Sequence, residues 1–367
     1  MTLLISNSDT AKVLEMKDAM AALETAYVDL AAGTAVCRPR IDISIPQREG
    51  GKVYQWGTME GGSTRGYFAI RMKSDVIYEH EYEGVRTQEK YCKEPGLFCG
   101  LVLLTSIENG EPLAILNDGL LQHVRVGADG GIGAKYMARE GAEVVGMLGS
   151  GGMARSHMAA LMEVRPIKRL QVFSPTAANR EAYAREMAQA HGIEAIACET
   201  PEEVYAGAHI ICGCTDSAVP IFLAERIEPG AHLMDVQSIP GEATLARVDA
   251  ALRLGNATTP WGLEDFAVTD RWITYGAAPD EAPDHKFKAM GQRGRPAIPD
   301  EKSALLGELL AGAKPGRTSD HEITYSERGN AQGAQFFAIA GMVYEKAKAA
   351  GLGHEIPTEW LLQDIRD

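Results

Sequence analysis

The feature that most constrains the fold of this chain is the run VVGMLGSGGMARSHM at residues 144–158, near the middle of the sequence. Residues Glu143 to Leu148 are short, mostly apolar and bounded by glycines, which predicts a buried parallel strand. The glycines that follow fit GxGxxA, and Ser156 to Val164 have helical periodicity. A strand, a glycine turn and a helix in this order predict an α/β, doubly wound parallel sheet of the Rossmann type.

The turn residues have separate physical roles. Gly149 permits a tight turn, Gly151 lets the backbone approach a pyrophosphate, and Ala154 lets the helix pack on the strand. The phosphates would lie on the helix N-terminus, where free N–H groups favour negative charge. The alternative is a purely structural glycine turn, which the second strand expected at Arg169 to Ser174 disfavours. We therefore expect a dinucleotide to contact Gly149, Ser150, Gly151, Gly152, Met153 and Ala154.

The end of the second strand predicts which nicotinamide cofactor is used. NAD enzymes place an acidic residue there to bind the ribose 2′-hydroxyl, but this chain has none before Glu181. Ser174, Thr176 and Asn179 offer hydroxyl and amide groups, and Arg180 offers a cation for a 2′-phosphate. This favours NADP over NAD; the alternative is that Arg180 is a solvated residue in the first turn of the next helix.

Further strand and helix signals follow. The expected strands Ile210 to Thr215 and His232 to Val236 bring Thr215 and Ser238 to the edge of the sheet that faces the cofactor. Together these elements predict a nucleotide-binding domain over residues 126–316.

The residues outside that domain predict a second, α+β domain. We expect helices at Thr10 to Ala32 and Phe336 to Ala350, and strands at Ile41 to Ile45, Tyr67 to Met72, Phe98 to Ser106 and Pro112 to Leu116. A further helix expected at Leu120 to Arg139 leads into the nucleotide-binding domain. Asn109-Gly110, between the last two strands, is a strong hairpin signal. The expected substrate domain is antiparallel and comprises residues 1–125 and 317–367. A length of 367 residues agrees with two domains, because one core rarely exceeds ~250–300 residues.

Composition excludes several classes of partner. The net charge of −14 argues against nucleic acid, which needs a basic face. No segment approaches the ~18 consecutive apolar residues of a membrane span, and the N-terminus does not resemble a secretion signal. The six cysteines form no CxxC pair, and Cys212-Gly-Cys214 lacks zinc-site spacing, so we expect free buried thiols, no metal and a cytoplasmic location.

Four motifs carry a resemblance to a known family. They are Arg38-Pro39-Arg40 followed by IDISIP, NGEPLAIL followed by HVRVGA, the turn GSGGMA, and GELLAG followed by Pro315-Gly316-Arg317. Over most of its length the chain resembles the ornithine cyclodeaminase/mu-crystallin family. The resemblance implies a Rossmann domain placed after a substrate and dimerisation domain, and hence a homodimer.

The resemblance also implies a chemistry. Members of the family reduce ketimines or dehydrogenate amino acids with NAD(P)H, or cyclise ornithine to proline with a recycled NAD. In each case a small imino, amino or 2-oxo acid is held by its carboxylate while a hydride crosses between its α-carbon and the nicotinamide. Arginine suits the carboxylate because its planar fork binds in bidentate fashion.

The resemblance places the carboxylate-binding positions of the family at Arg40 and Arg125. The alternatives are a surface ion pair for Arg40 and a helix-surface arginine at Arg125. The family's basic strand residue aligns with Arg71, with Lys73 two residues on and therefore on the same face of the strand. We expect Lys73 to donate a proton and Arg71 to contribute charge, although the reverse assignment stays open.

One departure from the family pattern distinguishes the possible activities. Cyclodeaminases carry an aspartate immediately before the Ile-Pro-Gly-like segment, where this chain has Ser238. The sequence thus favours an NADP-dependent reductase or dehydrogenase over an ornithine cyclodeaminase-type lyase. A non-catalytic nucleotide-binding or small-ligand-binding protein is the third alternative, and the retained Arg40, Arg125 and Lys73 count against it.

Overall fold

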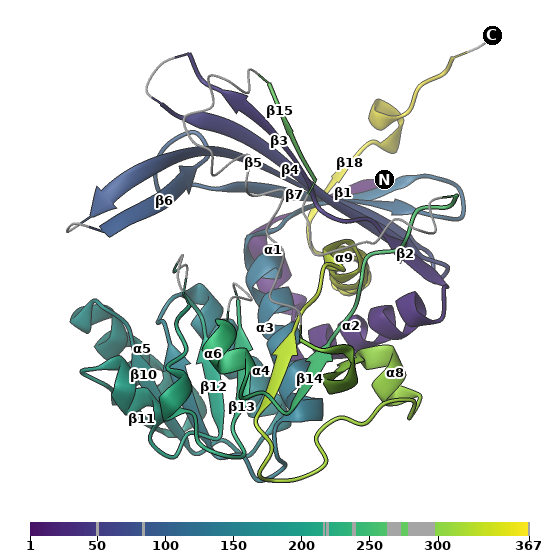
Figure 1. Ribbon diagram of the computed structural model, residues 1–367. Helices are drawn as coiled ribbons and strands as arrows, with labels where there is room; N and C mark the ends of the chain where they lie inside the picture. The colour runs from purple at the N-terminus through teal and green to yellow at the C-terminus, as the bar shows by residue number, and fades with distance from the viewer. Residues whose placement is uncertain are drawn as a thin grey trace.

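The structure of the protein is a computed structural model that describes residues 1–48, 51–82, 85–215, 217, 220–236, 240–262, 273–277 and 298–365. Within these residues the chain forms two sheets, with the helices α3 (Gly119–Met137) and α9 (Gln332–Ala349) between them (Figure 1). None of the described helices is long and apolar enough to cross a membrane.

The first sheet has ten strands in the order β15-β3-β4-β5-β7-β8-β1-β18, with β2 paired to β4 and β6 paired to β5. All described pairings in it are antiparallel except β1 with β8 and β15 with β3. The bounds are β1 Thr2–Ile5, β2 Ala35–Cys37, β3 Ile41–Pro46, β4 Val53–Ser63, β5 Tyr67–Tyr82, β6 Val85–Tyr91, β7 Cys99–Ser106, β8 Pro112–Asn117, β15 Ile273–Gly276 and β18 His354–Ile356.

The central strands of this sheet bury one face. Along β4 and most of β5, buried residues alternate with partly exposed ones, as expected when one face of a sheet packs on helices. α9 packs against that face, and α2 (Met16–Ala31) packs on α9 and on β2. The strand expected at Tyr67 to Met72 is much longer, because β5 pairs with β4 from Tyr67 to Ile77 and with β6 from Val76 to Tyr82.

The second sheet has eight strands in the order β11-β10-β9-β12-β13-β17-β14-β16, and every described pairing is parallel. The first five, numbered along the chain from β9, follow the order 3-2-1-4-5 of a Rossmann sheet, and β17 stands in the sixth position, so the predicted fold class is confirmed. The bounds are β9 Val144–Leu148, β10 Arg169–Phe173, β11 Glu194–Ala197, β12 Ile210–Gly213, β13 His232–Asp235, β14 Ala250–Arg253, β16 Ser303–Leu305 and β17 Thr324–Glu327.

Two strands join the sheet of the other expected domain. β17 lies in the second sheet between β13 and β14, although residues 317–367 were assigned to the substrate domain. β15 pairs with β3 in the first sheet, although it lies within residues 126–316. The chain therefore passes between the two sheets several times, and a short apolar run does not encode which sheet it joins.

The N-terminal helix is also divided. Thr10 to Ala32 was expected to be one helix, but α1 (Asn7–Val13) ends at Leu14, whose extended backbone separates it from α2. Ser6 caps α1. In the described residues the other helices are α4 Gly152–Val164, α5 Ala177–His191, α6 Glu242–Leu245 and α8 Leu306–Leu310, with short 3₁₀ turns at Pro201–Tyr205, Ala224–Arg226, Asp300–Lys302 and Thr358–Leu361.

Glycines on one face of α3 bring the two halves of the molecule together. A Cβ atom on Gly127 would lie 2.4 Å from the carbonyl carbon of Ser156, and one on Gly131 would lie 2.7 Å from the Cβ of Ala160. Gly130 lies between them on the same face. Because these positions carry no side chain, α4 packs closely against α3, and α3 in turn reaches the first sheet.

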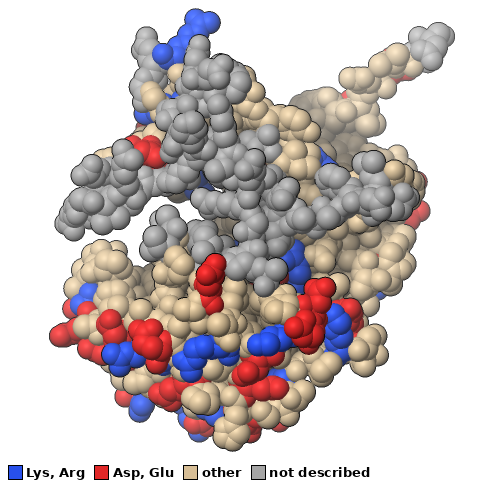
Figure 2. Space-filling model, in the orientation of Figure 1, with Lys and Arg blue, Asp and Glu red and all other residues tan. Residues whose placement is uncertain are grey.

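The surface charges are mixed. On the face shown in Figure 2, Lys and Arg side chains alternate with Asp and Glu over the part that contains the second sheet. The net charge of −14 is therefore not gathered into one acidic region on that face.

Candidate active site

A row of residues across the first sheet leaves room for charged groups. Lys73 on β5 pairs with Gly57 on β4 and with Gly100 on β7. A Cβ atom on Gly57 would lie 2.5 Å from Asp42 Oδ1, and one on Gly100 would lie 2.0 Å from Asp118 Oδ1. The two glycines thus provide the space that places one carboxylate on each side of the lysine.

Lys73 is almost completely buried, with 8% of its surface exposed. Its Nζ lies 2.6 Å from Asp75 Oδ2 and 3.1 Å from Gln55 Oε1. Burial, and next the positive charge of Arg40, lower the pKa of Lys73 to about 8, although Asp75 acts in the opposite direction. A lysine with such a pKa can both hold and release a proton near neutral pH.

Arg40 precedes β3 and is held beside this lysine. Its Nε donates to Asp42 Oδ1 at 2.9 Å. The other oxygen, Asp42 Oδ2, is buried and has no hydrogen-bond partner among the described residues. A buried carboxylate oxygen without a donor is costly, so it marks a place where a ligand N–H would be stabilised.

Arg71 lies on the same face of β5 as Lys73 but has its own acidic partner. Its Nε lies 2.6 Å and its Nη2 2.5 Å from Asp118 Oδ2. The guanidinium also lies 5.6 Å from the centroid of the Phe336 ring. The charge of Arg71 is therefore largely balanced within the protein.

Arg125, on α3, has a different environment. Only 3% of it is exposed, and its guanidinium lies 4.7 Å from the Phe336 ring centroid. Its Nε and Nη2 donate to Gln122 Oε1 at 3.1 and 2.8 Å, and its Nη1 donates to Gln335 Oε1. It has no ion pair with a carboxylate in the described part of the chain. Burial, followed by the nearby Arg328 and Arg71, lowers the pKa of Arg125 to about 9.

A buried network orients the amide that holds Arg125. Tyr27 donates its hydroxyl to Asp129 Oδ1 at 2.5 Å, and Gln335 Nε2 donates to Asp129 Oδ2 at 2.7 Å. Because the amide nitrogen of Gln335 is committed to this carboxylate, its oxygen faces Arg125. Burial raises the pKa of Asp129 to about 6.

The glycine turn after β9 lies at the carboxyl end of the second sheet, where the strand order reverses between β9 and β12. Gly149 has φ of 113°, and a Cβ atom there would lie 2.1 Å from the carbonyl oxygen of Cys214, so only glycine fits. A Cβ atom on Gly151 would meet nothing within 4 Å, which leaves open space in front of the turn.

α4 begins at Gly152 without a side-chain cap in the described residues, so its first N–H groups are available to a phosphate. Ala154 is fully buried against the sheet. The turn thus fits a pyrophosphate, with Ser150 in the loop and Met153 in the first turn of α4. His123 on α3 lies against Gly152, within 2.9 Å of where a Cβ would be, and connects the turn to the helix that carries Arg125.

The residues expected to select the cofactor gather at the end of β10. Ser150 Oγ lies 2.9 Å from Ser174 Oγ, which joins the turn to this strand. Arg180 Nη1 donates to the carbonyl oxygen of Ser174 at 3.1 Å, so the guanidinium folds back over the strand end. Thr176 and Asn179 are exposed beside it.

Thr215 lies two residues after β12, and its Oγ1 accepts a hydrogen bond from Ser217 N at 3.2 Å. It therefore lies at the same edge of the sheet as the turn. Ser238, on which the contrast with cyclodeaminases depends, lies outside the described residues.

The acidic partners of the basic residues were not predicted. Asp42 and Asp75 stand two residues after Arg40 and Lys73, a spacing that places side chains on one face of a strand and was available as a signal. Asp118 stands immediately before the helix that carries Arg125, and this position was a weaker signal of its role. Nothing near Gln335 in the sequence indicates its contact with Arg125, because 210 residues separate the two.

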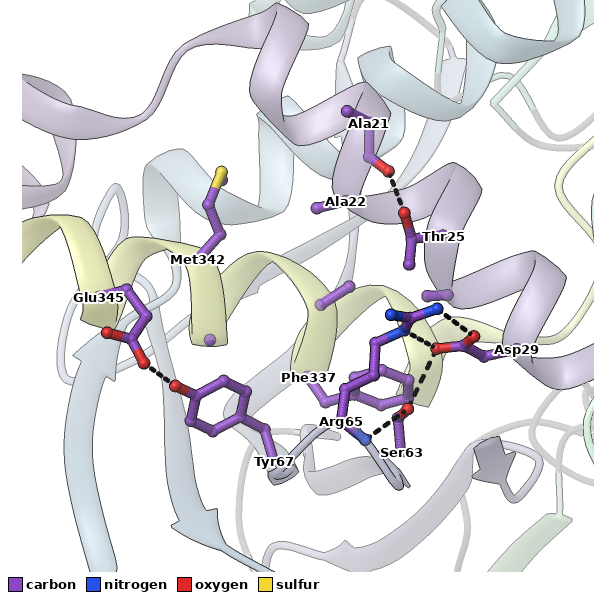
Figure 3. Close-up of a pocket in the computed structure, with 13 residues that line it drawn as sticks. Ala21, Ala22, Thr25, Asp29, Ser63, Arg65, Tyr67, Phe337, Met342 and Glu345 are labelled. Atoms are coloured by element: carbon purple, nitrogen blue, oxygen red, sulfur yellow. Dashed lines mark hydrogen bonds and ion pairs between the residues drawn. The ribbon is translucent and has the colours of Figure 1, made fainter. Parts of the chain in front are cut away.

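A separate cavity of about 360 Å³ lies between α2 and α9 (Figure 3). Its polar groups are bonded to one another: Arg65 donates to both oxygens of Asp29, at 2.5 and 2.9 Å, and the Tyr67 hydroxyl donates to Glu345. None of the four predicted basic residues lines it. The basic cluster and the glycine turn, not this cavity, form the candidate active site.

Known proteins resemble this chain in sequence and in fold. A Delta(1)-pyrroline-2-carboxylate reductase of Bacillus cereus is 24% identical over 361 residues, 96% of this chain and 99% of that relative. The structure of Thermococcus litoralis Delta(1)-pyrroline-2-carboxylate reductase in complex with NADH and L-proline superposes with a TM-score of 0.71 at 22% identity, and covers 97% of this chain and 100% of that one.

An archaeal alanine dehydrogenase dimer with bound NAD gives a TM-score of 0.70 at 23% identity, over 97% of this chain and 99% of that one. At these identities the two structures establish the shared fold. The model of the ornithine cyclodeaminase/mu-crystallin family matches residues 1–351. The predicted resemblance is confirmed: the chain belongs to the ornithine cyclodeaminase/mu-crystallin family.

Proposed function

We propose that this protein is an NAD(P)H-dependent oxidoreductase that reduces an α-imino acid or, in reverse, dehydrogenates the corresponding amino acid. The observation that carries the proposal is the environment of Arg125. It is a buried cation held by two amide oxygens, with no carboxylate ion pair among the described residues. A substrate carboxylate supplies the missing negative charge, and the planar guanidinium orients it.

The groups around Lys73 suit the nitrogen of the substrate. The proposed proton donor is the Lys73 ammonium, which transfers its proton to the imine nitrogen as the carbon accepts a hydride. The unpartnered Asp42 Oδ2 accepts the N–H that results, and Arg40 holds the other oxygen of this carboxylate in place. Arg71, held by Asp118, lies beside the same Phe336 ring as Arg125 and thus next to the proposed position of the substrate carboxylate.

The nicotinamide cofactor supplies the hydride when it is bound. Its pyrophosphate fits the open side of the turn from Gly149 to Ala154. We infer a preference for NADP, supported by Arg180 at the end of β10 and by the absence of an acidic residue from 174 to 180. A domain that binds substrate (residues 1–125 and 317–367) and one that binds nucleotide (126–316) remain our proposal, apart from the two strand exchanges described above.

We also infer a homodimer formed through the first sheet. Apolar side chains are exposed on β2, β3 and β7, at Val36, Ile43, Ile45 and Leu101, and a second copy would cover them. The alanine dehydrogenase of similar fold is described as a dimer. The six cysteines are free, which supports a reducing cytoplasmic compartment.

The test is NADPH oxidation by the purified protein. The substrates are Δ1-pyrroline-2-carboxylate and, separately, pyruvate with ammonia or with methylamine. We expect one NADPH to be consumed for each amino acid formed. Ammonia release from ornithine without net cofactor consumption would instead identify a cyclodeaminase-type lyase. Tight NADPH binding with no turnover of any of these substrates would identify a binding protein.

A further inference from the structure

Three soft ligand groups meet beneath the glycine turn. They are His157 on α4, Cys212 on β12 and Cys214 just after that strand, and all three are buried. The two sulfur atoms are 3.5 Å apart, and one ligand atom from each residue lies within 4.8 Å of the others. The sulfur separation is well above the ~2.05 Å of a disulfide, so both cysteines are free thiols.

The spacing of the cysteines places both sulfurs on one side of the sheet. Residues two apart in a strand point to the same face, which here is the face covered by α4. Gly213, between them, faces the opposite side, where a Cβ atom would lie 2.5 Å from Ile221. Cysteine spacing alone gives no signal for this cluster, because its third member is a histidine from a helix that packs on the strand.

The histidine is held in the form that binds metals. Its Nδ1 lies 2.7 Å from the carbonyl oxygen of Met153, to which it donates its proton. Nε2 then carries the lone pair in the neutral ring. A ring nitrogen that donates to a backbone carbonyl while the other binds the ion is the usual arrangement of a metal-ligating histidine.

We propose that His157, Cys212 and Cys214 form a binding site for one thiophilic metal ion, Zn²⁺ or Cu⁺. Two thiolates and an imidazole, with no oxygen ligand, select such ions over Mg²⁺ or Ca²⁺. Zn–S bonds of about 2.3 Å in tetrahedral geometry place two sulfurs roughly 3.8 Å apart, close to the observed separation.

The thioether sulfur of Met234 is a candidate fourth ligand. Met234 Sδ and His157 Nε2 lie 3.1 and 2.9 Å from the same point, the position of a Cβ atom on Gly130. The bound ion would join β12 to α4 directly below the turn, because the carbonyl of Cys214 contacts Gly149 and that of Met153 holds the histidine. This inference concerns folding of the turn and does not depend on the proposed reaction.

The experiment measures metal bound to the full-length reduced protein. Metal-free protein is refolded with Zn²⁺ alone or Cu⁺ alone, passed over a chelator, and its metal content is determined by mass spectrometry. We expect one ion per chain, and its loss in the double variant Cys212→Ser/Cys214→Ser. The matched control is Cys92→Ser/Cys99→Ser, which alters two neighbouring cysteines outside the cluster and should retain the ion.

A spectroscopic measurement on the unmodified protein keeps the test decisive if the variant does not fold. Co²⁺, used as the probe, should give the intense thiolate-to-cobalt absorption of a tetrahedral sulfur site. His157→Gln should weaken Co²⁺ binding while the sulfur absorption persists at high Co²⁺. Failure of the wild-type protein to bind Zn²⁺, Cu⁺ and Co²⁺, or loss of binding only in the Cys92/Cys99 variant, would overturn the proposal.

Discussion

Replacing the charges around Lys73 should move the pH dependence of imine reduction in opposite directions. The proton donor is active as the ammonium, so kcat/KM should be constant at low pH and fall about tenfold per unit above a pKa of about 8. An unburied lysine would remain protonated to about 10.5. The sign follows from burial: it disfavours the charged form and brings deprotonation to lower pH.

Asp75→Asn and Arg40→Met test the two electrostatic contributions. Asp75 lies 2.6 Å from the ammonium and raises its pKa, so its removal should lower the inflection by about 1–3 units. Arg40 lowers the pKa of Lys73, so its removal should move the inflection to higher pH. We expect a shift of about one pH unit, because Asp42 already screens the charge of Arg40. Asp42 and Lys90 also face this site and stay unchanged in both variants.

The assay is initial-rate NADPH oxidation with the best imino acid substrate, measured from about pH 6 to 10. Arg40→Met should also lower the rate at every pH, because Arg40 lies beside the substrate, so the position of the inflection is the informative quantity. Lys73→Met should remove the inflection. Shifts of both variants in the same direction, or an unchanged inflection in Lys73→Met, would refute the role of this lysine.

Other substitutions test the remaining parts of the site. Arg125→Ala should reduce kcat/KM at least ~100-fold, with partial rescue by Arg125→Lys, in the same assay; a loss below tenfold would reject the carboxylate role. Arg180→Ala should weaken NADPH binding by about 1.5–3 kcal/mol in fluorescence titrations and leave NADH binding nearly unchanged, whereas equal losses would reject NADP selection. Gly57→Ala should lower activity by displacing Asp42, whereas Gly141→Ala, which meets nothing within 4 Å, should not. Light scattering should give a dimer, and a mass of 39.5 kDa at micromolar concentration would contradict it.

The local parts of the fold were readable from the sequence. The strand, the turn with Gly149 and the helix after it form as predicted, because their pattern depends only on neighbouring residues. The full length of β5 and the break at Leu14 could not be predicted from the sequence. They depend on the partner strands and on packing against α9. The assignment of β15 and β17 to their sheets likewise depends on contacts between residues far apart in the chain.

In the candidate site, too, some features could be predicted from the sequence and others depend on contacts between residues far apart in the chain. Family resemblance identified its basic residues, and the structure brings Arg71 and Arg125 to one aromatic ring and Arg40 close to Lys73. Their counter-charges come from adjacent strands and from the start of α3, so their identity depends on strand register. Gln335 required the complete fold, because its contact with Arg125 links α9 to α3.

The row Asp42, Gly57, Lys73 and Gly100 makes the site a test of correct strand alignment during folding. If β4 slipped by one residue, Trp56 or Thr58 would stand beside the lysine and fill the space now left to Asp42. A misaligned sheet could still be compact and strongly β-structured, yet it would lack the paired charges. Recovery of activity on refolding should consequently lag behind recovery of secondary structure whenever misaligned sheets accumulate.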